Sequence, residues 1–215
     1  MLPRRHLATL TELCELPPLP DDADWNGLDI AYLDRDGVLN IGSENYINSP
    51  EELIVLDNAA EAVSTIRAAG FRICIVTNQS PVGRGHWDHE KLAEINSALQ
   101  SELLSQHPDA HLDLILYSPY APWENAWSRK GRPGMLQVGR QILTATNKGI
   151  ELTEFDYGPA YIPVDEGNSF MVGDRDADMK AGLSFGVRTF RCNPDVGLYD
   201  VLSRVLLFSD RGDNF

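Results

Sequence analysis

The decapeptide AYLDRDGVLN, residues 31–40, carries the clearest structural signal in the chain. The apolar run Ile30–Leu33 predicts a buried strand that ends at Asp34, and Gly37 allows a sharp turn directly afterwards. Two carboxylates, Asp34 and Asp36, would then lie at the carboxyl end of a strand, where ligands bind in an open parallel sheet. One could act as a nucleophile beside a metal and the other as an acid/base, although Asp is also common at solvated strand exits.

Strands and helices alternate along the chain from residue 29. The expected strands span residues 29–34, 72–77, 112–117, 169–173 and 187–191. The expected helices span residues 58–69, 88–106, 134–147 and 176–183. This alternation predicts an α/β domain in which the strands pair in parallel through right-handed crossovers.

Composition limits the class of protein. The chain has 215 residues, of which 43% are hydrophobic, enough for one sizeable core. Its 32 acidic and 18 basic residues give a net charge of −14, which argues against a general binder of nucleic acid or of anionic membranes. No stretch approaches the ~20 apolar residues of a membrane span, so we expect a soluble, cytoplasmic protein. The three cysteines show no metal-binding or disulfide spacing.

The expected domain has an extension at each end. Residues 1–28 contain the proline-rich and acidic stretch LPPLPDDAD and form an N-terminal extension. Residues 29–192 form the α/β domain, within which residues 149–168 are an irregular excursion. Residues 193–215 form an acidic tail that we expect to pack on the same domain through the amphipathic stretch Leu198–Leu207.

Two further segments place polar groups near the expected strand ends. The segment FRICIVTNQS, residues 71–80, delivers Thr77, Asn78 and Gln79, whose hydroxyl and neighbouring backbone N–H groups could bind a phosphoryl oxygen. The alternative is an ordinary polar turn capped by Thr77 or Ser80.

The segment SRKGRPGM, residues 128–135, presents Arg129 and Lys130 before a helix. Lysine suits neutralisation of a phosphoryl oxygen and arginine can bind a second anionic group, although a basic pair is often simply a solvated loop.

A third carboxylate follows the strand in FMVGDRDADMKAG, residues 170–182. Asp174 directly after this strand suits Mg²⁺, which binds a few protein carboxylates together with water and substrate oxygens. Asp178 lies four residues further on. Asp176 is interpreted as an acid at a helix start, where the helix dipole favours it.

Taken in order, these segments resemble the haloacid dehalogenase (HAD) superfamily of phosphatases. The motifs DRDGVLN, TNQSPVGRG, RKGRPGM and GDRDADM are similar to those of its histidinol-phosphate/heptose-bisphosphate phosphatase group. The resemblance covers about residues 29–192. It implies a Rossmann-like three-layer sandwich, the HAD fold, with a parallel sheet and a minimal or absent cap, because residues 40–59 leave no room for a large one.

The resemblance also implies roles for individual residues. Asp34 would attack phosphorus to form an aspartyl-phosphate, and Asp36 would act as acid and then as base. Mg²⁺ would bind the Asp34 carboxylate, the Asp36 backbone carbonyl and Asp174, while Thr77 and Lys130 would hold the transferring phosphoryl group. The expected substrate-binding residues are Asn78, Gln79, Ser80, Arg84 and Arg129. Asp178 would support the site by orienting Lys130 or a water bound to the metal.

One segment departs from the family pattern. Many members carry a zinc loop before the lysine, with Cys-x-His followed by Cys-x-Cys. Here the corresponding positions are Ser118 with Tyr120 and Ala126 with Ser128, none of which is a good Zn²⁺ ligand in that geometry. We therefore expect no structural zinc. Packing by Trp123 and the neighbouring aromatic residues could stiffen the segment instead, or the segment could be mobile.

The activity that the resemblance implies is removal of one phosphate from a sugar bisphosphate such as D-glycero-D-manno-heptose 1,7-bisphosphate. Histidinol phosphate, another small phosphomonoester or a polynucleotide 3′-phosphate are alternative substrates, although the acidic composition disfavours nucleic acid. A binding module without catalysis is a further alternative, but such a module would not need Asp36 as well as Asp34. The motifs leave the exact substrate, the anomer preference and the oligomeric state open.

Overall fold

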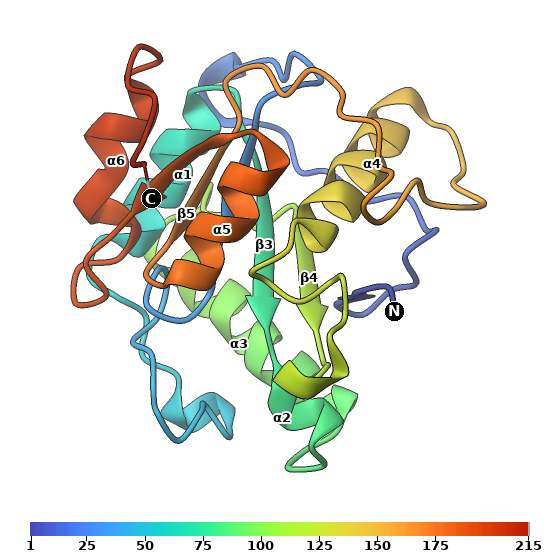
Figure 1. Ribbon diagram of the computed structural model, residues 1–215. Helices are drawn as coiled ribbons and strands as arrows, with labels where there is room; N and C mark the ends of the chain where they lie inside the picture. Colours follow the sequence, from blue (N-terminus) through green and yellow to red (C-terminus); the bar gives the residue numbers. More distant parts are fainter. Residues whose placement is uncertain (215) are drawn as a thin grey trace.

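The computed structural model, which describes residues 1–214, is built around a six-stranded sheet (Figure 1). The strands are β1 (Arg4–Arg5), β2 (Ile30–Leu33), β3 (Arg72–Asn78), β4 (Leu114–Ser118), β5 (Phe170–Gly173) and β6 (Arg188–Arg191). They lie in the order β1-β4-β3-β2-β5-β6. The five strands expected from the sequence are confirmed to within two residues, and all of them pair in parallel.

The expectation of a purely parallel sheet is wrong at one edge. Strand β1 pairs antiparallel with β4, with Arg4 opposite Tyr117 and Arg5 opposite Leu116. Two adjacent arginines show none of the apolar alternation that predicts a strand, so this pairing has no local signal in the sequence. The N-terminal segment thereby covers what would otherwise be the open edge of β4.

Helices cover both faces of the sheet (Figure 1). They are α1 (Ala59–Ala68), α2 (Ser80–Gly83), α3 (His89–Gln106), α4 (Gly134–Lys148), α5 (Asp176–Phe185) and α6 (Leu198–Leu206), with short 3₁₀ turns at Pro20–Asp22, Pro50–Glu52 and Pro122–Glu124. Helices α1, α3 and α6 pack on one face, and α4 and α5 pack on the other. The four helices expected from the sequence are confirmed to within two residues, and the three-layer α/β architecture is as predicted.

The sheet is buried on both faces because its strands are apolar at successive positions. In β2, Ala31 and Leu33 join the core beneath α1, whereas Ile30 and Tyr32 join the core beneath α4. All four side chains are fully buried. This near-continuous apolar pattern is typical of central parallel strands.

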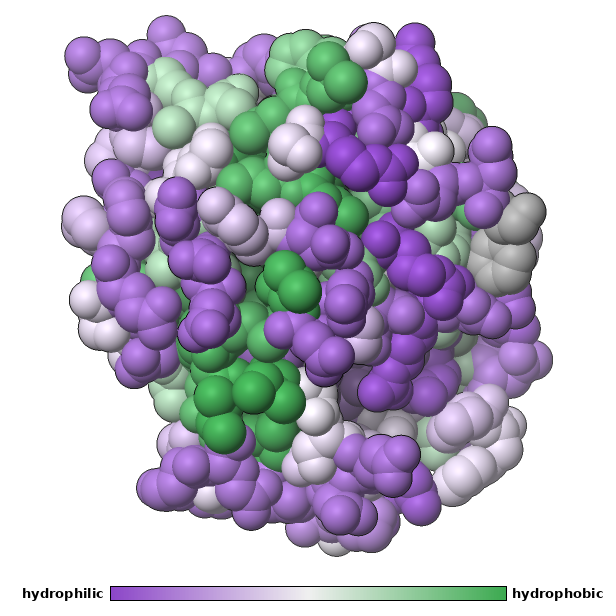
Figure 2. All heavy atoms as spheres, turned by 90° about the vertical axis from the view of Figure 1, so that its left-hand side faces the viewer, coloured by the Kyte–Doolittle hydropathy of each residue, from purple (hydrophilic) through white to green (hydrophobic). Residues whose placement is uncertain are grey.

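The C-terminal tail packs beside β6 through α6. Leu198, Val201 and Val205 are buried on the side of α6 that meets α1. Figure 2 shows this side of the molecule, where apolar residues form a band between hydrophilic ones. Gly212 forms a bridge with Thr189 of β6, so the described part of the tail follows the sheet edge; residue 215 lies outside the described residues.

A buried ion network joins the N-terminal segment to the domain. The Asp113 carboxylate accepts from Arg67 at 2.8 Å, from Arg72 at 3.0 Å and from the backbone N–H of Ile73 at 2.8 Å. The same two arginines donate to the backbone carbonyls of Pro17 and Pro18.

Among residues 1–214, no helix is both long enough and apolar enough to cross a membrane.

Candidate active site

The turn after β2 places the first two carboxylates. The backbone N–H of Asp34 donates to Val172 of β5 at 3.0 Å, which keeps Asp34 in line with the sheet. Gly37 then adopts a φ of +78°, a left-handed conformation that glycine tolerates best. Its N–H donates to the Asn40 carbonyl at 2.8 Å, and this contact folds the chain back over Asp36.

A buried lysine lies between two carboxylates. Lys130 Nζ is 2.5 Å from Asp34 Oδ1 and 2.7 Å from Asp178 Oδ1. Burial lowers the pKa of Lys130, but Asp178 and Asp34 outweigh it and raise the pKa above its usual value. Burial raises the pKa of Asp34, opposed by Lys130 and reinforced by Asp178 and Asp36. Lys130 is therefore held as a cation against the expected nucleophile.

Asp174 completes a group of three carboxylates. Carboxylate oxygens of Asp34, Asp174 and Asp178 lie within 4.8 Å of one another, and no other His, Cys, Asp and Glu side chains in residues 1–214 form such a group. Asp174 Oδ1 is buried and has no hydrogen-bond partner among the same residues. Burial, together with the charge of Asp178, raises the pKa of Asp174. An all-oxygen set with an unused buried oxygen fits a hard cation such as Mg²⁺.

The Asp36 carboxylate is held by three donors. Arg35 donates to both of its oxygens at 3.0–3.2 Å, Asn40 donates to Oδ1 at 2.9 Å, and Gln79 donates to Oδ2 at 3.0 Å. Burial raises the pKa of Asp36, but Arg35, Asn40 and Gln79 together outweigh it and lower the pKa below its usual value. Arg35 is itself buried and donates to Asn96 Oδ1 of α3 at 3.0 Å.

Sequence analysis did not single out Arg35, Asn40 or Asn96. Arg35 and Asn40 both lie inside the DRDGVLN motif. The position of Arg35 between Asp34 and Asp36 was a signal that could have identified it. Asn96 lies 61 positions from Arg35, and its contact depends on the packing of α3.

The polar residues at the end of β3 mostly bind other protein groups. Thr77 Oγ1 accepts from Gln79 Nε2 at 3.0 Å. Asn78 Oδ1 accepts from the backbone N–H of Lys130 at 2.9 Å, so Asn78 positions the lysine segment. Ser80 begins α2 and is buried. Of the expected substrate-binding residues, Asn78 and Gln79 therefore use their side chains to orient Lys130 and Asp36.

These groups line one cleft of about 450 Å³ at the carboxyl ends of β2, β3 and β4, which point downward in Figure 1 towards α2. The predicted residues that line it are Asp34, Asp36, Thr77, Asn78, Gln79, Ser80, Arg84, Arg129, Lys130 and Asp178. Asp174 is not among the lining residues, but it belongs to the carboxylate group described above. Tyr46 and Glu44 also line the cleft, and neither was predicted from the sequence.

The segment in place of a zinc loop is held by hydrogen bonds. Ser118 Oγ and Ser128 Oγ are both buried and lie 3.4 Å apart. Arg129 donates to the Tyr120 carbonyl at 2.9 Å, and Trp127 Nε1 donates to Gln137 at 2.9 Å. Trp123, one of the aromatic residues that could stiffen the segment, is 73% exposed.

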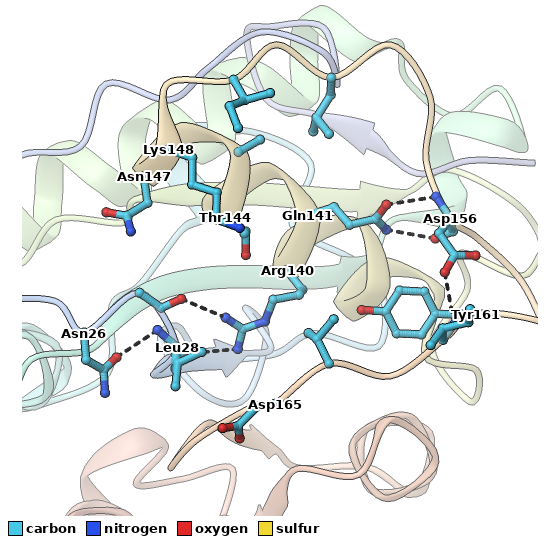
Figure 3. Close-up of a pocket in the computed structure, with 16 residues that line it drawn as sticks. Asn26, Leu28, Arg140, Gln141, Thr144, Asn147, Lys148, Asp156, Tyr161 and Asp165 are labelled. Carbon is cyan, nitrogen blue, oxygen red and sulfur yellow. Dashed lines mark hydrogen bonds between the residues drawn. The ribbon is translucent and has the colours of Figure 1, made fainter.

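A larger pocket, of about 620 Å³, is lined in part by residues that precede β2, near the amino end of the sheet (Figure 3). It is formed by α4, by the residues before β2 and by the excursion 149–168. Figure 3 shows Arg140 directed towards Leu28, and Gln141 in two hydrogen bonds with Asp156. The residues before β2 lie at the amino end of the sheet, and the excursion 149–168 lines this pocket together with them. No residue of the excursion lines the catalytic cleft.

Comparison with known proteins identifies the family. The chain is 32% identical to D-glycero-β-D-manno-heptose-1,7-bisphosphate 7-phosphatase from Pseudomonas aeruginosa over 166 residues, which cover 77% of this chain and 78% of that relative. The chain belongs to this family of HAD-type phosphatases. It is therefore a phosphoric monoester hydrolase. The D-glycero-D-manno-heptose-1,7-bisphosphate 7-phosphatase of Chlorobaculum tepidum is 30% identical over 165 residues, 74% of this chain and 76% of that relative.

The fold of the family is also found by structural comparison. A crystal structure of D,D-heptose 1,7-bisphosphate phosphatase from B. bronchiseptica, complexed with magnesium and phosphate, matches with a TM-score of 0.65. The match covers 83% of this chain and 98% of that chain at 24% identity, which establishes a shared fold. No protein family model matches the chain.

Proposed function

We propose that this protein is a Mg²⁺-dependent phosphomonoesterase that removes one phosphate from a sugar bisphosphate, such as D-glycero-D-manno-heptose 1,7-bisphosphate, through an aspartyl-phosphate. The observation that carries the proposal is the arrangement in one cleft of Asp34, Asp36 and Lys130 beside Asp174 and Asp178. The relatives named above act on that bisphosphate, which supports the substrate class. Residues 29–192 would form the phosphatase domain, extended by residues 1–28 and 193–215.

In the first step an Asp34 oxygen attacks phosphorus, and the bond between phosphorus and the ester oxygen breaks. Asp36 donates a proton to that leaving oxygen. In the second step Asp36 removes a proton from water, the water oxygen attacks phosphorus, and phosphate leaves as Asp34 is regenerated. Lys130 and Thr77 stabilise the charge on the transferring phosphoryl oxygens throughout.

Asp36 must gain a proton before the first step. Its three donors favour the ionised carboxylate in the free protein. A phosphate dianion entering the same cleft raises the pKa of a neighbouring carboxyl, because two negative charges repel each other in a site shielded from water. Substrate binding would therefore supply the protonated form of Asp36 where it is needed.

The residues present fit a bound Mg²⁺. Its protein ligands would be the carboxylates of Asp34 and Asp174 and the backbone carbonyl of Asp36, and the buried unpaired Asp174 Oδ1 is the observation that supports this assignment. When bound, Mg²⁺ offsets the negative charges of nucleophile and phosphate. Asp178, already paired with Lys130, would hold that lysine in place.

The test is phosphate release from a substrate panel, with and without Mg²⁺. The panel contains both anomers of heptose 1,7-bisphosphate, histidinol phosphate, other sugar phosphates and an oligonucleotide 3′-phosphate. We expect Mg²⁺-dependent loss of one phosphate from a heptose bisphosphate, and no turnover by Asp34→Asn. The matched control is Asp176→Asn, since Asp176 is exposed, pairs with Arg191 and does not line the cleft.

Normal turnover by Asp34→Asn would refute the covalent route. Activity confined to other esters would retain the chemistry and refute the proposed substrate. No phosphate release from any ester would favour a binding module.

A further inference from the structure

Three segments that are distant in the sequence meet at the mouth of the catalytic cleft. Arg84, just after α2, donates to the Tyr46 hydroxyl at 2.8 Å. The same guanidinium lies over the Trp123 ring, 5.7 Å from its centroid. Tyr46 comes from the loop before α1 and Trp123 from the segment after β4, so Arg84 connects the two sides. We call Tyr46, Arg84 and Trp123 the rim triad.

The rim triad is fixed from both sides. The Tyr46 ring packs edge-to-face against Trp87 at a centroid distance of 5.8 Å, and its backbone has a φ of +65°, which is uncommon for a residue other than glycine. On the other side, Gly83 N–H donates to the Pro119 carbonyl at 3.0 Å, which ties the Arg84 turn to the segment that carries Trp123. A long, exposed arginine is thereby restricted to one direction.

The charge on this rim lacks a partner. Neither Arg84 nor Arg129 forms an ion pair with a carboxylate within residues 1–214, although the chain carries a net charge of −14. Both line the cleft, together with Tyr46 and the exposed Glu44. Two unpaired guanidinium groups beside one cleft in an acidic protein indicate an anionic ligand.

In the proposed function Lys130 and Thr77 hold the transferred phosphate, so the anion that Arg84 binds would be a second one. Resting on the function proposed above, we propose that Arg84 determines specificity by binding a second anionic group of the substrate, and that Tyr46 and Trp123 are the residues that position it. Tyr46 occupies one N–H of the guanidinium, and the remaining N–H groups can bind a phosphate with two parallel hydrogen bonds. The selected substrate class is a compound with two phosphates.

The experiment compares two substrates that share the reaction but differ in the second anion. One is the heptose 1,7-bisphosphate that the wild-type protein hydrolyses best, and the other is p-nitrophenyl phosphate. We expect Arg84→Met to lower kcat/KM about 10- to 100-fold for the bisphosphate, mainly through KM, and to change the value for p-nitrophenyl phosphate by less than about 2-fold.

The positioning residues have a weaker but parallel effect. Tyr46→Phe removes only the hydroxyl, and Trp123→Ala removes the stacked ring, so each should lower the preference for the bisphosphate about 3- to 10-fold. Trp123→Phe should restore most of that loss. The matched control is Arg132→Met, because Arg132 also stacks on a tryptophan, Trp127, but does not line the cleft.

Two results would overturn the inference alone. One is an unchanged preference for the bisphosphate in Arg84→Met, and the other is an equal loss on both substrates, which would indicate a structural role. A wild-type protein without activity on either substrate would overturn the proposed function as well, so the two failures are distinguishable.

Discussion

Replacing Gly37 by alanine should weaken Mg²⁺ binding as well as the fold. Gly37 has a φ of +78°, and a Cβ atom added there would lie 2.8 Å from Asp174 Oδ2 and 2.8 Å from Asp174 Cγ. Alanine in a left-handed conformation costs about 1–2 kcal/mol, which is the expected loss in the free energy of unfolding. The contact with Asp174 adds a separate effect on the metal site.

The size of that second effect follows from the distance. Ordinary van der Waals contact begins at 3.4 Å, so the Asp174 carboxylate must move by about 0.6 Å. Metal–ligand distances in well-formed sites lie within about 0.2 Å of their usual values, so a carboxylate displaced this far should bind the cation less tightly. We expect the Mg²⁺ concentration for half-maximal activity to rise at least about tenfold, equivalent to about 1.4 kcal/mol.

The assay is phosphate release against Mg²⁺ concentration, paired with urea denaturation. Gly186→Ala is the matched control, because Gly186 also has a positive φ, +92°, but a Cβ atom there would meet nothing within 4 Å. It should lose similar stability and keep the wild-type Mg²⁺ dependence. Equal Mg²⁺ dependence in Gly37→Ala, Gly186→Ala and the wild type would refute the reasoning.

Two further substitutions separate stability from catalysis. Asp113→Ala leaves two arginines in the buried network without their carboxylate, so the free energy of unfolding should fall by about 3–5 kcal/mol; a loss below about 1 kcal/mol in urea denaturation would contradict this. Asn78→Ala removes the side-chain acceptor for the backbone N–H of Lys130 and should lower kcat about 3- to 10-fold in steady-state assays, whereas an unchanged kcat would show that Lys130 is positioned without it.

The architecture and the convergence of the polar groups at one edge of the sheet could be predicted because their signals are local. Apolar runs with flanking turn residues indicate buried strands, and helical spacing indicates the elements between them. Asp34 and Asp174 directly follow two of those strands, and Thr77 lies near the end of a third. Since parallel strands end at the same edge of a sheet, the local pattern predicts their convergence without knowledge of any long-range contact.

The supporting contacts required the folded chain. Three of these contacts join segments that are far apart in the sequence. They are the pairing of Arg4 and Arg5 with β4, the contact of Asn96 with Arg35, and the contact of Arg84 with Tyr46. A polar or charged residue in a loop has many possible partners, and only packing selects one of them. The strand ends and the polar groups that gather there could therefore be predicted from the sequence. The tertiary structure alone decided which donors restrain Asp36 and which residues hold Arg84 at the rim.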